Sequence, residues 1–249
     1  MFEIIAHRGY ASKAPENTLA AFDLAVEAGF RNLELDVRLS ADGQAVVIHD
    51  ASLERTTDGR GKVREWSFLD LRRLDAGAWF GSGEFAGEHV PALSEVVERY
   101  GDDCHLHVEL KSKNLDVARV AADELAPLLV RPSLAFDPFG VPGLTVTSFH
   151  SEQLVEFRRA ASGRCRLGWL VEEVDQDVVD RALRAEFHGV YPKAARVTSD
   201  RVRMLKDAGL SVRAWKVSEV GLVRSLSDLG VEAGTVDWPD LARELLSRR

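Results

Sequence analysis

The sequence is poor in several features by which particular classes of protein are recognised, and cysteine is the first of them. Only Cys104 and Cys165 occur, and they form neither a CxxC pair nor the spacing of a zinc site. We therefore expect buried thiols in a reducing compartment, with a disulfide between them as the less favoured alternative.

Long apolar runs are missing as well. No stretch approaches the roughly 18 apolar residues of a membrane-spanning helix. The first residues contain Glu3 and only a brief apolar run, which is not the pattern of a signal peptide. These observations predict a cytoplasmic protein without a stable membrane anchor. We expect it to be a monomer or a homodimer.

The chain also lacks an excess of basic charge. It has 32 Lys and Arg against 40 Asp and Glu, with a formal net charge of −8. A groove for DNA or RNA favours the opposite balance, so we expect no nucleic-acid partner. A small anionic substrate remains compatible with this charge, because a metal ion and a few cationic side chains can reverse its sign locally.

Short β-type runs alternate with amphipathic helical segments, which predicts a parallel sheet covered by helices. The first of these runs is followed by HRGYAS, which lacks the GxGxxG spacing of a dinucleotide-binding fold, so an α/β barrel is favoured. Ser151, Thr198 and Ser218 are expected to cap helices, and Pro239 to begin the last one. The expected strands are 2–6, 33–37, 45–49, 105–111, 144–149, 166–171, 189–192, 211–217 and 234–237.

One of these strands exceeds the eight of a (β/α)₈ barrel. The link from 33–37 to 45–49 turns at Asp42-Gly43 and is shorter than the dozen or more residues that a parallel crossover needs. These two strands should therefore form an antiparallel hairpin. We predict an irregular TIM (β/α)₈ barrel in which residues 1–249 form a single domain.

Residues 51–95 interrupt the alternation of strands and helices. The segment is rich in glycine and aromatic residues, and its one clear helix begins at Ser67, where Asp70 completes a capping arrangement. Segments of this length are often lids or binding elements. We expect a small insertion after the third strand that lies over the barrel mouth. The alternative is a surface elaboration without a role.

Two of the expected strands carry charged residues at alternate positions. Glu34 and Asp36 share one face of the first, and His107, Glu109 and Lys111 share one face of the second. Carboxylates that point into a barrel repel one another unless a cation lies between them, and Mg²⁺ and Ca²⁺ prefer such oxygen ligands. The alternative for Glu34 and Asp36 is the solvated face of an edge strand. His107 is expected to make a structural hydrogen bond.

Two histidines, His7 and His49, stand at the ends of apolar strands. Beside the same carboxylates they would suit an acid–base pair, since the imidazole pKa lies near neutrality. Arg8 adds a planar donor fork that fits phosphate. Asp50 is expected to orient His49 or the following turn.

The first helix begins at Glu16 and Asn17, where the alternative for Asn17 is helix capping. Trp215 lies near the end of a late strand, and it could form either an aromatic wall over a ligand or part of the core. These patterns leave both alternatives open.

Taken together, these motifs resemble the glycerophosphodiester phosphodiesterase family. The matching strings are AHRG, APENT, ELDVRLSADGQAVVIHD, LERTTDGRGKV, LDAGAWF, PALSEV, HVELK, TSF and AWKV, in order across nearly the whole chain. Family members usually read close to ITDRP or ITDYP near the C-terminus. This chain reads TVDWP at 235–239 and keeps Asp237 and Pro239.

The resemblance implies an irregular (β/α)₈ barrel that hydrolyses glycerophosphodiesters to glycerol 3-phosphate and an alcohol. It implies a divalent cation, Mg²⁺ or Ca²⁺, held by Glu34, Asp36 and Glu109. It also implies that His7 and His49 are the acid and the base, without saying which is which. The attacking group would be the neighbouring 2-hydroxyl, giving a cyclic phosphate first, or water.

The resemblance assigns five further residues to the substrate side of the site. Arg8 matches the phosphate contact and Lys111 the charged group beside it. Glu16 and Asn17 match the PENT box near the site, and Trp215 matches the aromatic at the mouth.

Three alternatives to this function stay open on the sequence. A lysophospholipase D-like or a sphingomyelinase D-like barrel would use the same site on lipids. A catalytically silent barrel would only bind phosphodiesters, although the intact histidines and acids argue against it. A purely structural protein would leave this many inward charges unexplained.

Overall fold

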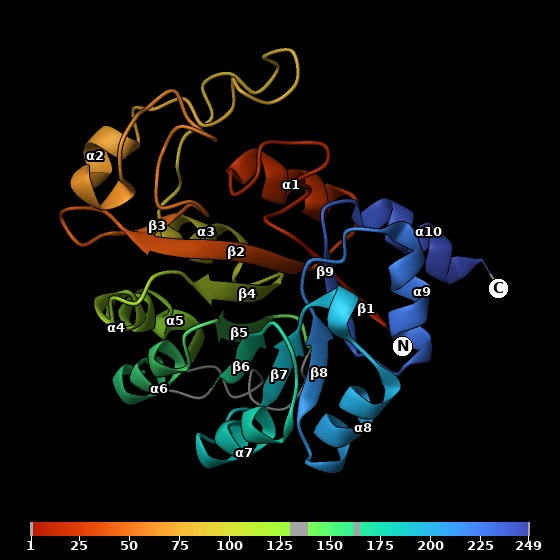
Figure 1. Cartoon of the computed structure of the whole chain (residues 1–249). Helices are drawn as coiled ribbons and strands as arrows, with labels where there is room; N and C mark the ends of the chain where they lie inside the picture. The colour runs from red at the N-terminus through yellow and green to blue at the C-terminus, as the bar shows by residue number, and fades with distance from the viewer. Residues whose placement is uncertain (1, 130–138, 162–164, 249) are drawn as a thin grey trace.

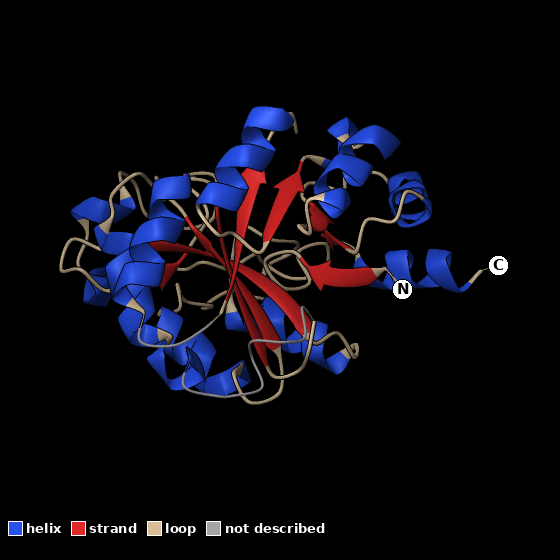
Figure 2. Ribbon diagram, turned by 90° about the horizontal axis from the view of Figure 1, so that it is seen from below, coloured by secondary structure: helices blue, strands red, loops and turns tan. Residues whose placement is uncertain are grey.

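The computed structural model describes residues 2–129, 139–161 and 165–248. Within them, eight parallel strands close into a barrel because β1 pairs with both β9 and β2. Figure 2 shows the strands at the centre with helices around them. The predicted TIM-type barrel is confirmed. Its strands are β1 (Glu3–Ala6), β2 (Asn32–Leu39), β4 (His105–Leu110), β5 (Gly143–Ser148), β6 (Arg166–Val171), β7 (Gly189–Pro192), β8 (Ser211–Ala214) and β9 (Ala233–Val236).

The extra strand is β3 (Ala45–Val47), which lies antiparallel beside β2 with Val37 opposite Val47. The predicted hairpin is therefore confirmed. Strand β3 is shorter than predicted and ends before His49, so this histidine lies on the loop that follows it. Strand β8 is shorter too and ends before Trp215.

The helices begin largely where the sequence predicts. The hydroxyls of Thr18, Ser67 and Thr198 each accept a hydrogen bond from a backbone N–H in the first turn of the following helix, and Pro239 is the first residue of the last helix. The helices are α1 (Leu19–Glu27), α2 (Phe68–Leu71), α3 (Leu93–Tyr100), α4 (Asp116–Glu124), α5 (Ala126–Leu129), α6 (Ser151–Ala160), α7 (Gln176–Arg184), α8 (Ser199–Asp207), α9 (Val220–Asp228) and α10 (Pro239–Ser247), with short 3₁₀ turns η1 (Val63–Glu65) and η3 (Ala194–Arg196).

Two of the predicted caps are wrong. His150 and Glu219 occupy the capping positions of α6 and α9, and neither side chain caps its helix. Ser151 is instead the first residue of α6, and Ser218 lies one residue before the cap of α9. A serine near a helix start is only a weak guide to the cap position, since boundaries shift by one or two residues.

The strand alternation separates the core from the barrel interior. Leu33, Leu35 and Val37 are fully buried in the core formed between strands and helices. The alternate residues Glu34 and Asp36 therefore point into the barrel. Cys104 and Cys165 are free thiols. Among the residues described, no helix has the length and apolar character needed to cross a bilayer.

Residues 51–95 contain η1, α2 and long loops, drawn in orange to olive above β2 and β3 in Figure 1. They have a small core of their own, separate from the main one and shared with side chains from β3 and the residue after it. The members of this small core are Val46, Ile48, Leu53, Val63, Leu71, Ala76 and Val90. Helix α3 then returns the chain to the barrel.

Candidate active site

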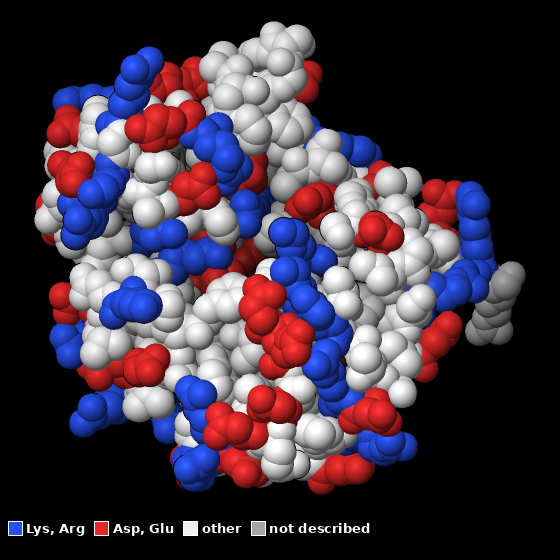
Figure 3. All heavy atoms as spheres, in the orientation of Figure 1, with Lys and Arg blue, Asp and Glu red and all other residues white. Residues whose placement is uncertain are grey.

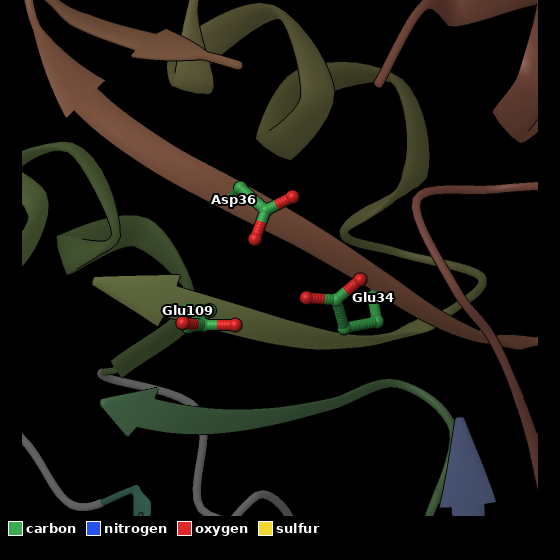
Figure 4. Close-up of side chains that lie close together, drawn as sticks. All are labelled: Glu34, Asp36 and Glu109. Atoms are coloured by element: carbon green, nitrogen blue, oxygen red, sulfur yellow. The ribbon is translucent and has the colours of Figure 1, made fainter. Parts of the chain in front are cut away.

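Three buried carboxylates converge on the inner face of two adjacent strands. Glu34 and Asp36 extend from β2, and Glu109 extends from β4, where it is paired in register with Asp36. One oxygen from each lies within 4.8 Å of the others. Figure 4 shows the three groups turned toward one another. The inward face predicted for Glu34 and Asp36 is confirmed, and the solvated edge strand is wrong.

The charge of this cluster is only partly compensated. The Lys111 ammonium lies 3.1 Å from Asp36 Oδ1 and 2.5 Å from Glu109 Oε1. Burial raises the pKa of Asp36, but Lys111 and Arg8 outweigh it and leave that pKa low. Burial and the charge of Asp36 raise the pKa of Glu34 well above its usual value. Two cationic side chains leave the three carboxylates with an excess of negative charge, which a further cation would reduce. Carboxylate oxygens are the ligands that a hard divalent ion prefers.

The loop after β1 carries His7 and Arg8 to this cluster. Arg8 adopts a left-handed conformation with φ 54°. Its N–H donates to Glu34 Oε2 at 3.0 Å, and its Nε lies 3.1 Å from Asp36 Oδ2. Gly9 follows with φ 82°, and a Cβ there would lie 2.6 Å from the backbone of Ala21 in α1. The loop thus needs glycine to pack against α1 while Arg8 faces the acids.

Asn17 lies beneath the carboxylates and does not cap the helix. Its Nδ2 donates to Asp36 Oδ2 at 2.8 Å, and its Oδ1 accepts from the Asp36 N–H at 3.2 Å. The capping alternative is wrong, since Thr18 caps α1. Asn17 has φ 60°, a conformation that asparagine tolerates better than most residues. Glu16 turns the other way and accepts a hydrogen bond from Arg8 at 2.6 Å.

Each of the two histidines is paired with an aspartate. His49 Nδ1 lies 2.6 Å from Asp50 Oδ1, and His7 Nδ1 lies 2.6 Å from Asp237 Oδ1. An Nδ1–H donated to the aspartate leaves Nε2 as the second nitrogen available for chemistry. The carboxylate partner also fixes the orientation of each ring.

The two imidazoles are shifted in opposite directions. Burial lowers the pKa of His49, and the attraction of Asp36 does not fully offset it. Burial also lowers the pKa of His7, but Glu34 and the Asp237 hydrogen bond outweigh it, so that pKa is raised. A cation bound to Glu34 would remove the largest influence that raises the pKa of His7.

These groups open into one cavity of about 360 Å³. Figure 3 shows acidic and basic atoms together in the hollow at the centre of this face. Glu16, Asn17 and Asp36 lie behind the lining, each in contact with a residue that forms it. The predicted site residues that line the cavity are His7, Arg8, Glu34, His49, Glu109, Lys111 and Trp215.

An aromatic pair forms part of the cavity wall. The Trp215 and Phe149 rings pack edge to face with their centroids 4.9 Å apart. Trp215 Nε1 donates to the carbonyl of Val171 at 2.9 Å, which fixes the indole. Trp215 is half-buried, so it is a cavity wall rather than part of the barrel core.

Among the site residues that the sequence reasoning missed, two orient groups proposed from the sequence. Asp237 follows β9 and orients His7 from the far end of the chain, and the aspartate of TVDWP was the pattern that could have identified it. Arg55 contacts both Asp50 and Glu16. Its position in LERTTDGR carries no strand or helix periodicity that would have singled it out.

Comparison with known proteins identifies the family of this chain. The model of the glycerophosphoryl diester phosphodiesterase family matches residues 7–241. The chain belongs to this family. The glycerophosphodiester phosphodiesterase of Caldanaerobacter subterraneus subsp. tengcongensis is 31% identical over 246 residues, which cover 98% of each chain.

Solved structures of glycerophosphodiester phosphodiesterases and a related phosphodiesterase share the barrel. A phosphodiesterase of Oleispira antarctica, solved with its product sn-glycerol-3-phosphate, is 30% identical with a TM-score of 0.86, covering 98% of this chain and 96% of its own. A glycerophosphodiester phosphodiesterase from Agrobacterium tumefaciens is 29% identical with a TM-score of 0.79, covering 98% and 100%. As a member of this family, the protein is a phosphoric diester hydrolase.

Proposed function

We propose that this enzyme hydrolyses glycerophosphodiesters to sn-glycerol 3-phosphate and an alcohol, using a divalent cation and two histidines. The observation that carries the proposal is the meeting, at one barrel mouth, of three buried carboxylates with two histidine–aspartate pairs. The reaction needs one group that removes a proton and one that donates a proton. Two imidazoles in different environments can fill these two roles.

The cation would be Mg²⁺ or Ca²⁺, held by Glu34, Asp36 and Glu109. Their close approach, their burial and the raised pKa of Glu34 support this ligand set. When bound, the cation supplies Lewis-acid stabilisation of the negative charge that develops on the phosphate. Asn17 holds Asp36 and the Arg8 N–H holds Glu34, so both carboxylates are oriented before a ligand arrives.

Arg8 and Lys111 bind the phosphate oxygens. Both line the cavity at its acidic end, and both carry a charge that their carboxylate neighbours keep in place. Arg8 offers a planar fork, and Lys111 acts as a point charge. Glu16 holds the guanidinium of Arg8, so we assign it and Asn17 a supporting role in substrate binding.

The proton transfers occur at Nε2 of His7 and Nε2 of His49. One removes the proton from the attacking oxygen, and the other protonates the leaving alcohol. Asp237 and Asp50 hold the two rings through Nδ1. Trp215 provides an aromatic wall for the part of the substrate that does not react.

The test is turnover of glycerophosphocholine, followed by the release of glycerol 3-phosphate and by ³¹P NMR. We expect turnover that EDTA abolishes and that Mg²⁺ or Ca²⁺ restores, and only slow turnover of lysophosphatidylcholine. A protein that binds the cation but releases no product would contradict the proposal. Preference for the lipid would redirect it to a lysophospholipase D-like activity. A cyclic phosphate in the NMR spectrum would identify the 2-hydroxyl as the attacking group.

A nitrophenyl ester of glycerol phosphate then assigns the two histidines. Nitrophenolate leaves without protonation, so loss of the general acid should matter much less for this substrate. The histidine whose alanine variant recovers activity on the nitrophenyl ester is the acid, and the other is the base. A recovery of neither variant would contradict an acid–base pair.

A further inference from the structure

Arg55, in the 51–95 insertion, binds two carboxylates of the site and donates from each of its three guanidinium nitrogens. Its Nε donates to Asp50 Oδ2 at 2.6 Å. Its two terminal nitrogens donate to the two oxygens of Glu16 at 2.7 and 2.8 Å. The contact with Glu16 is the bidentate arrangement that the planar fork favours.

The two carboxylates continue into the groups proposed for catalysis. The other oxygen of Asp50 holds His49 Nδ1 at 2.6 Å. Glu16 Oε1 also accepts from the guanidinium of Arg8 at 2.6 Å. An unbroken series of hydrogen bonds therefore runs from His49 through Asp50, Arg55 and Glu16 to Arg8.

Arg55 also keeps both carboxylates in the charged form that these contacts need. Its hydrogen bond is the largest cause that lowers the pKa of Asp50, to about 2. Burial raises the pKa of Glu16, but the hydrogen bond from Arg55 and the charge of Arg8 bring it below its usual value. Charged hydrogen-bond acceptors orient their partners more strongly than neutral ones.

Arg55 belongs to the insertion, so its hydrogen bonds connect this segment to the active site. The segment 51–95 packs largely on a small core of its own. It is joined to the barrel by backbone hydrogen bonds at Trp66 and Pro91 and by side chains that reach across. Arg55 is such a link, and it does not line the cavity among the described residues. Its influence on the reaction must therefore pass through Asp50 and Glu16.

We propose that Arg55 is a positioning residue that fixes His49 relative to Arg8, and so the proton-transfer group relative to the phosphate. The proposal rests on the proposed function, because it takes His49 and Arg8 in the roles given above. Orientation of a reacting imidazole affects the chemical step, whereas orientation of Arg8 affects substrate binding.

Arg72→Gln is a matched control for Arg55→Gln. Arg72 lies in the same insertion, its side chain is 43% exposed against 44% for Arg55, and it is ion-paired to Glu95 at 2.5 Å. Its partner belongs to the start of α3 and not to the site. The two variants should unfold at similar temperatures. We expect Arg55→Gln to lower kcat on glycerophosphocholine about 10- to 100-fold and to raise KM, and Arg72→Gln to change neither.

Arg55→Lys keeps the charge but loses the fork, so we expect an intermediate loss. If Arg55→Gln does not fold, Arg55→Lys can test the proposal in its place. A kcat within twofold of the parent in both Arg55 variants would overturn the proposal.

Double variants show whether Arg55 acts by positioning His49 or by a general effect on the fold. We expect Arg55→Gln to cause no further loss of kcat in the His49→Ala background, because the ring that it orients is gone. In the His7→Ala background the loss should persist. A loss that simply multiplies in both backgrounds would overturn the proposal. Full turnover by His49→Ala alone would instead overturn the proposed function on which it rests.

Discussion

Two pairs of histidines lie along the barrel, one at its mouth and one at its floor, and they differ in the groups that hold them. At the mouth, His7 and His49 each contact an aspartate at 2.6 Å. At the floor, His105 and His107 stack with ring centroids 4.4 Å apart, and the partners described for them are neutral oxygens and an arginine.

The contact with Arg213 requires a neutral His107. Arg213 donates to His107 Nδ1 at 2.8 Å, so that nitrogen carries no proton, and Nε2–H donates to Asn32. Burial lowers the pKa of His107 well below its usual value and that of His105 to about 3. The comparison teaches that the partner and not the residue type decides the role. An aspartate partner favours the protonated imidazolium, whereas burial without an anionic partner favours the neutral ring.

The largest effect is expected when the imidazole rings themselves are removed. We expect His7→Ala and His49→Ala each to lower kcat roughly 10²- to 10⁴-fold, because each removes an acid or a base. His107→Gln should lower stability, measured by thermal unfolding, while the kcat of the folded fraction stays within a few-fold of the parent. The comparison fails if the floor variant loses as much kcat as the mouth variants.

The next test removes the aspartates and leaves the rings. The Asp50 carboxylate binds both His49 and Arg55, whereas the only hydrogen bond described for the Asp237 carboxylate is the one with His7. We therefore expect Asp50→Asn to lower kcat about 10- to 100-fold and Asp237→Asn to lower it less, within the range for groups that orient a functional imidazole. Steady-state kinetics at saturating substrate measure both. Equal losses would mean that the Arg55 contact adds nothing to Asp50.

The same comparison shows what the sequence could predict. Asp50 adjoins His49 in the chain, and Glu34 and Asp36 share a strand, so period-two alternation and adjacency predicted all three. Asp237 meets His7 only because β9 lies beside β1 in the closed barrel. No local pattern encodes such a pairing, and the same holds for Arg55, which reaches the site from an irregular segment.

The third test uses the pH dependence of stability. The unfolded chain takes up protons on its histidines as the pH falls through about 6.5, while the folded floor histidines stay neutral. The stability that they allow is therefore complete above about pH 6.5 and is lost as the pH falls, by about 1.4 kcal/mol per pH unit for each histidine. Urea unfolding between pH 7 and pH 5 measures this slope.

The control for this slope is the double variant His105→Gln/His107→Gln, in which the mouth histidines and the surface carboxylates are unchanged. Its free energy of unfolding should fall less steeply than that of the parent over the same pH range. Parallel slopes would show that the floor histidines take up protons in the folded state, contrary to the contacts described for them.

The smallest expected effect comes from giving a floor histidine the partner of a mouth histidine. Asn32→Asp would place a carboxylate oxygen where the amide oxygen now accepts from His107 Nε2. The new charge should raise the pKa of His107, but Arg213 still donates to Nδ1 and opposes the proton. We therefore expect the pH slope to become shallower without reaching that of the double variant, and kcat to remain within twofold. An unchanged slope would mean that burial alone keeps the floor neutral. Loss of the whole contribution of His107, about 1.4 kcal/mol per pH unit, would mean that a carboxylate suffices to protonate His107 even opposite an arginine.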